Sequence, residues 1–177
     1  MTVLLRIAAF IDALNAAIGR ATAWLILLCT LISGLTATLR YAFDIGSNAL
    51  LEAQWFLFGL VFLFCAAWTL GDNGHVRIDI LHARLAPRTR AWIEIFGSLL
   101  FLLPVCLLIM VDAWNFFLIA YQTDEASPNP GGLLWWPLKL AIPVAFGLLS
   151  LQGVAEIIKN IAMLTGDRPL PTRSGGH

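Results

Sequence analysis

Three side chains that can bind a metal lie close together in this sequence. His75, Asp79 and His82 are spaced four and three residues apart, which places them on one face if the segment is helical. Two imidazoles and a carboxylate are common zinc ligands, but no fourth ligand is apparent nearby. The segment also lies between two long apolar stretches, where an exposed loop is expected. We therefore favour a polar loop at a membrane or partner surface, with a metal site as the alternative.

Two carboxylates at the edges of apolar stretches are the next candidates. Asp112 follows the apolar run Ile95–Val111, and ionisable residues within membrane segments often mark ion or proton pathways. Counting from Trp92 places Asp112 about 30 Å along a helix, which favours a position near the outer interface over a relay. Glu52 begins another apolar run and is expected to pair with Arg40 at the outer surface.

The other residue types argue against catalysis. All three histidines lie outside the apolar stretches, and each of the three cysteines lies inside one, as small hydrophobic residues do. Neither a nucleophile–base pair nor a phosphate-binding loop is apparent. The formal net charge is zero, which gives no indication of a nucleic-acid partner. We therefore expect no enzyme activity, no catalytic residues, no cofactor and no bound metal.

Four long apolar stretches determine the class of fold. Hydrophobic residues make up 59% of the chain and charged residues 12%, whereas soluble domains have about 45–50% and about 25%. The stretch Ala21–Leu39 has 19 residues without a charge, enough for about 28 Å of helix. Within hydrocarbon the backbone must satisfy its own hydrogen bonds, so each stretch is expected to be helical. We predict an all-α integral membrane protein with four transmembrane helices at about residues 21–40, 51–71, 92–121 and 135–160.

The cationic residues predict the orientation of these spans. Nine of the 11 lysines and arginines precede the first span, lie between the second and third, or follow the fourth. Positive charge favours the cytoplasmic side, so both termini are expected in the cytoplasm. The tryptophans agree, because they lie near the ends of the spans and not at their centres.

The segments outside the spans complete the predicted organisation. Residues 1–20 show helical amphipathicity, and we favour a helix lying flat in the inner interface over a simple extension of the first span. Residues 1–165 form one membrane domain, followed by a flexible cytoplasmic tail at 166–177. A stripe of small residues, Thr30, Gly34 and Thr38, is suited to close helix packing, either within the chain or against a partner.

Charged loops are the candidate contact sites. The cluster Arg77, Arg84, Arg88 and Arg90 is expected to bind anionic lipid headgroups on the inner side. On the outer side, Asp124 and Glu125 make the loop 122–136 acidic and suit it to contact a partner protein. No Asp, Glu, Lys, Arg or His lies at the centre of any span, nor is there a pair of Gly-interrupted helices of the kind that form midplane substrate sites. These features favour a scaffold over a pore or an enzyme.

The inner loop carries a family resemblance. The run from Glu52 through TLGDNGHVRIDIL to Arg90 resembles the small membrane subunit, DctQ-like, of tripartite ATP-independent periplasmic (TRAP) transporters. Those proteins have four spans, a glutamate at the start of the second and a G-x-H-V-R-x-D segment after it. Here that segment comprises Gly74 to Arg77 and Asp79. The outer SPNPGG sequence and the run LQGVAEIIKNI are also similar to the family.

The resemblance implies a function that composition does not. In such systems the small subunit braces a large permease subunit that holds the substrate and sodium sites, in the bacterial inner membrane. A periplasmic binding protein delivers an organic acid, and an ion gradient drives uptake. The alternatives from other classes are a stand-alone membrane enzyme or metal-binding protein that uses the His75/Asp79/His82 loop, and a small independent channel. The candidate partner or lipid contacts are Glu52, His75, Arg77, Asp79, Arg84, Arg88, Arg90, Asp124 and Glu125.

Overall fold

The computed structural model describes residues 2–72 and 85–166, and nearly all of them are helical. The elements are α1 (Thr2–Phe43), α2 (Asn48–Gly71), α4 (Pro87–Gly97), the π-helix η1 (Ser98–Leu102), α5 (Leu103–Gln122) and α6 (Trp136–Leu164). Because α4, η1 and α5 follow one another without a break, they form one helix over Pro87–Gln122. The described residues therefore contain four helices long and apolar enough to cross a membrane, which confirms the predicted all-α four-helix class.

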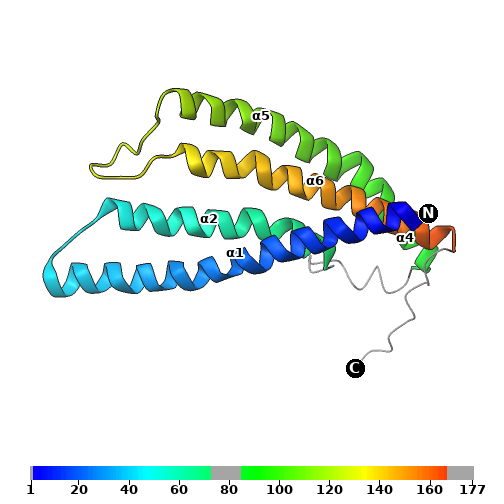
Figure 1. Ribbon diagram of the computed structural model, residues 1–177, viewed down its shortest axis with the longest axis horizontal. Coiled ribbons are helices and arrows are strands. Elements are labelled where there is room, and N and C mark those ends of the chain that lie inside the picture. Colours follow the sequence, from blue (N-terminus) through cyan, green and yellow to red (C-terminus); the bar gives the residue numbers. More distant parts are fainter. Residues whose placement is uncertain (1, 73–84, 167–177) are drawn as a thin grey trace.

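Toward the end with the connections 44–47 and 123–135, the four long helices lie side by side as a layer in the order α1, α2, α6, α5, and at the other end α1 crosses α6 (Figure 1). α1 packs on α2 and on α6, α2 packs on α6, and α6 packs on α5, so that α6 is the most enclosed of the four. In the described part of the chain α5 makes no substantial contact with α1 or α2. The layer therefore has an end that holds Thr2 and Leu164, called here the terminal end, and an opposite end with the connections 44–47 and 123–135, called the loop end.

Residues 2–20, predicted as an N-terminal amphipathic helix, continue into the first span without a break, because α1 runs through residue 20. Its 42 residues give a length of about 63 Å, roughly twice the hydrocarbon core of a bilayer. Ala8 and Ile11 are buried against Ala155 of α6, so the N-terminal half is held by packing on the bundle. Whether residues 2–20 lie in the inner interface stays a prediction.

Glycines lie at several points where helices approach closely, among them Gly19 and Gly153. A Cβ atom at Gly19 of α1 would lie 2.6 Å from the indole ring of Trp68 in α2. A Cβ atom at Gly153 of α6 would lie 2.4 Å from the side chain of Leu102 in η1. Small residues at these positions let the backbones pack closely, which is the main means of helix association in a bilayer.

The π-helix η1 lies immediately before Pro104. The proline has no backbone N–H and its ring would clash with the carbonyl four residues earlier in a regular α-helix. In the structure, the backbone N–H of Leu103 donates to the carbonyl of Ser98, the i→i+5 pattern of a π-helix. The wider turn lets the helix continue past the proline, and α6 similarly continues through Pro143.

Candidate functional site

Glu52 of α2 is the centre of the loop end. Its side chain is buried, and its carboxylate accepts hydrogen bonds from the hydroxyl of Ser127, the side-chain amide of Asn129 (3.0 Å) and the backbone N–H of Leu133 (2.7 Å). The predicted pair with Arg40 is wrong, because Arg40 is exposed and is not a partner of Glu52 in the described residues. Glu52 instead anchors the loop that joins α5 to α6.

The same loop is closed by an internal ion pair. The ammonium of Lys139, itself buried, lies 2.5 Å from the Glu125 carboxylate and 3.7 Å from the ring centroid of Phe116. The backbone N–H of Trp135 donates to the carbonyl of Glu125 at 2.9 Å, and this bond holds the two ends of the loop together. Glu125 is therefore used within the chain, and only Asp124 of the predicted acidic pair is fully exposed.

A second polar network lies near the terminal end, between α1 and α6. The buried side chain of Gln152 accepts a hydrogen bond from the amide of Asn15 (2.7 Å) and donates to the carboxylates of Asp12 (2.7 Å) and Glu156 (3.2 Å). The ammonium of Lys159 bridges the same two carboxylates, at 2.9 Å from Asp12 and 2.6 Å from Glu156. One cation and one amide thus join two helices that are distant in sequence.

Sequence reasoning missed this network, although a signal exists. Gln152, Glu156 and Lys159 are spaced four and three residues apart, which is the spacing of one helix face, and Asp12 and Asn15 are three apart on α1. A polar stripe on each of two otherwise apolar helices indicates a hydrogen-bonded crossing in a membrane protein.

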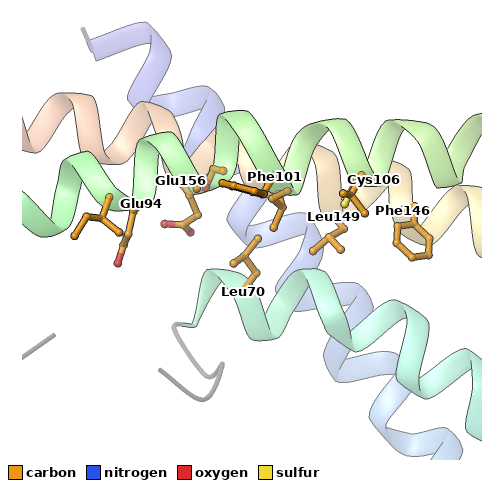
Figure 2. A pocket seen from close by; sticks show the side chains of 12 residues that line it. Leu70, Glu94, Phe101, Cys106, Phe146, Leu149 and Glu156 are labelled. Atoms are coloured by element: carbon orange, nitrogen blue, oxygen red, sulfur yellow. The ribbon is translucent and has the colours of Figure 1, made fainter. Parts of the chain in front are cut away.

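A groove of about 560 Å³ lies beside this network, between the C-terminal end of α2 and the α4–η1–α5 helix (Figure 2). Three walls line the groove, and they include Leu70 of α2, Phe101 of η1 and Leu149 of α6. The lining is almost wholly apolar. Toward the terminal end the lining includes two carboxylates, Glu94 of α4 and Glu156 of α6. Glu94 also accepts a hydrogen bond from the side chain of Asn160 at 3.2 Å, which ties α4 to α6.

Several predicted contact residues lie outside the described part of the chain: His75, Arg77, Asp79 and Arg84, together with His82 of the alternative metal site. Of the other basic candidates, Arg88 is exposed, and Arg90 donates from Nε to the carbonyl of Leu85 at 3.2 Å. In residues 2–72 and 85–166 there is no group of three or more His, Cys, Asp or Glu placed to hold a metal ion.

The small-residue stripe on α1 faces away from the rest of the chain. Thr30, Gly34 and Thr38 are exposed, and no atom of the described residues would lie within 4 Å of a Cβ at Gly34. The contact with α2 uses a different face, on which Thr36 accepts a hydrogen bond from the side chain of Gln54 at 3.3 Å. The stripe therefore does not pack against the described residues of its own chain, and its use against a partner stays a prediction.

These observations define a class of protein. Four long apolar helices in one layer, with buried polar networks toward its two ends, make a multi-pass membrane protein. The profile of the family described as tripartite ATP-independent periplasmic transporters, DctQ component, matches residues 29–163, about three quarters of the chain. The chain therefore belongs to the DctQ family, which is a transporter component and not an enzyme family. No curated protein and no solved structure shows a significant match to the chain.

Proposed function

We propose that this chain is the small membrane subunit of a TRAP-type secondary transporter of the bacterial inner membrane and that it braces the large permease subunit. The large subunit, with its ion and substrate sites, takes up an organic acid delivered by a periplasmic binding protein, driven by an ion gradient. The observation that supports this role most directly is that all four long helices carry exposed large apolar side chains. These side chains offer packing surface to another membrane protein.

The two polar networks suit the layer to bracing. At the loop end, Glu52 fixes the loop between α5 and α6 to the start of α2. Near the terminal end, Gln152 and Lys159 fix α1 to α6. Buried polar networks whose members are bonded together rigidify a structure, so motion of a bound partner would be resisted by the layer as a whole.

Co-purification and transport test this function. The chain is co-expressed with the large membrane subunit of the same transporter, and we expect the two to co-purify in detergent. In proteoliposomes, uptake of the organic acid should require both subunits, the binding protein and an ion gradient. Uptake or ion conductance by the isolated chain would contradict the bracing role and favour the channel alternative. Loss of an enzymatic activity on replacing His75, Asp79 and His82 with alanine would favour the enzyme alternative.

The contact with the periplasmic binding protein calls for two separate variants. Asp124 is exposed, whereas Glu125 is paired with Lys139, so each tests a different role. We expect Asp124→Lys to raise the concentration of binding protein needed for half-maximal uptake, with the subunit complex intact. Glu125→Lys should destabilise the loop itself, because it places two ammonium groups together. Unchanged uptake kinetics for Asp124→Lys would contradict contact at this position.

A further inference from the structure

The groove between α2 and the α4–η1–α5 helix continues as an exposed stripe along α5. Val105 lines the groove, and Leu108 and Asp112 follow it at three and seven residues, so the three side chains share one helix face. Val105 and Leu108 are 54% and 64% exposed, and Asp112 is exposed as well. The groove and the stripe together form a continuous surface, called here the α5 face.

The helix that forms the α5 face has a local irregularity beside the groove. Ser98, Phe101 and Leu102 of the π-helix η1 all line the groove, and the adjoining Gly97 lines it too. No atom of residues 2–72 or 85–166 would lie within 4 Å of a Cβ at Gly97, so this part of the chain leaves the backbone open to a close neighbour there. Isolated π-helical turns occur often at functional sites, and small residues permit close helix approach in membranes.

Among the described residues, the ionisable side chains of the α5 face are carboxylates, and one of them, Glu156, is already paired with Lys159. Glu94 and Glu156 line the groove toward the terminal end, and Asp112 lies ten residues before the end of α5, about 15 Å along the helix. Within the described residues Asp112 has neither a hydrogen bond nor an ion pair. At the depth that its sequence position predicts, near the outer interface, a carboxylate on the exposed side of a membrane-crossing helix faces either water or a neighbouring protein. A basic residue on a neighbouring helix would compensate it.

From these three observations we infer that the α5 face binds a transmembrane helix of the large permease subunit, and that this helix carries a lysine or arginine opposite Asp112. This inference rests on the proposed function and adds to it the surface and the chemistry of the contact. The groove accepts apolar side chains of the helix, Gly97 allows its backbone to approach, and Asp112 sets its register. The small-residue stripe of α1 lies on the opposite edge of the layer and is not required for this contact.

Photo-crosslinking gives the first test. The benzophenone amino acid p-benzoylphenylalanine is placed at Phe101 on the α5 face and, as a matched control, at Trp24 of α1, because both aromatic side chains are 72% exposed. On irradiation of membranes containing the whole transporter, position 101 should cross-link to the large subunit and position 24 should not. Lipid adducts alone at position 101, or cross-linking from position 24 alone, would overturn the inference.

Paired variants give the second test. Gly97→Leu places a side chain in the groove, and Gly34→Leu on α1 is its control, because both glycines are helical and no atom of the described residues would lie within 4 Å of a Cβ at either. We expect Gly97→Leu to reduce recovery of the large subunit by about tenfold or more, and Gly34→Leu to leave it unchanged. Equal recovery with both variants would refute the inference.

A charge series at one position completes the test. Asp112→Lys should abolish co-purification through like-charge repulsion, whereas Asp112→Asn should weaken it only partly. Fluorescence-detected gel filtration of the isolated variants checks that they fold. If the wild-type subunit fails to bind the large subunit, the proposed function itself fails. If it binds and the Asp112→Lys variant binds equally well, only the assignment of the α5 face fails.

Discussion

Replacement of Gln152 by leucine tests whether the network near the terminal end holds α1 to α6. The amide of Gln152 is fully buried and makes three hydrogen bonds, one from Asn15 and one each to Asp12 and Glu156. Leucine has a similar size but no polar atoms, so it removes all three bonds with little change in volume. The two carboxylates keep Lys159 as a partner, whereas Asn15 loses its interhelical bond.

The size of the effect follows from these contacts. Two of the three bonds, those with Asn15 and Asp12, join α1 to α6, and hydrogen bonds between membrane helices contribute about 0.6 kcal/mol each on average, which gives about 1 kcal/mol. Asn15 is 1% exposed, and its Oδ1 atom has no partner among the described residues, so Gln152→Leu would leave the whole amide unsatisfied there. A buried polar group without a partner costs about 1–3 kcal/mol. We therefore expect a loss of about 2–4 kcal/mol in the free energy of unfolding.

Unfolding in mixed micelles, followed by tryptophan fluorescence during titration with sodium dodecyl sulfate, measures this loss. The double variant Asn15→Leu/Gln152→Leu removes the orphaned amide, so it should recover at least about 1 kcal/mol relative to Gln152→Leu alone. Thr38→Ala is the control, since its exposed hydroxyl bonds only to its own helix backbone, at Gly34. A loss below about 0.5 kcal/mol for Gln152→Leu, or a double variant less stable than either single one, would refute the reasoning.

Three further predictions concern packing and the loop end. Gly19→Ala should destabilise the isolated subunit by about 1–3 kcal/mol, because its methyl group would lie 2.6 Å from the Trp68 ring. The control Gly34→Ala should be neutral or stabilising. Thermal unfolding compares the stability of the two variants. Glu52→Gln should speed proteolysis of the loop 123–135, because an amide NH₂ cannot accept the hydrogen bonds that the carboxylate accepts. An unchanged cleavage rate in limited proteolysis would contradict the anchoring role of Glu52. Lys139→Met should lower stability by about 1–3 kcal/mol through loss of a mostly buried ion pair and a cation–π contact, which the thermal midpoint would report.

The helices were predictable because membrane insertion depends on features local to the sequence. A stretch such as Ala21–Leu39 is identified by its length and its lack of charge, and both can be counted directly. The partners of charged residues are not local. Glu52 was expected to pair with Arg40, which is near in sequence, but its partners lie 75 to 81 residues away in the loop before α6.

The break predicted near residue 20 has the same origin. The amphipathic pattern of residues 1–20, with Asp12 outside the apolar arc, predicted a helix separate from the uncharged stretch that begins at Ala21. In the structure, Asp12 is compensated by Lys159 and Gln152 of α6, so the charge does not require the helix to end. A charge partner on another helix allows a charged residue to lie within a continuous helix, and hydropathy alone does not show that such a partner exists.

The arrangement of the four helices in one layer also lies beyond local sequence, and it changes how Asp112 is interpreted. Sequence position gives only the depth of this carboxylate along its helix, which favoured a place near the outer interface. If α5 were packed on several helices of a bundle, the Asp112 side chain could face one of those helices and not the outside of the subunit. In the layer α5 packs on α6 alone among the other three long helices, and the exposed side of α5 carries Asp112 in line with the groove. The direction of the side chain, and not its depth, is therefore what connects Asp112 with a second membrane protein.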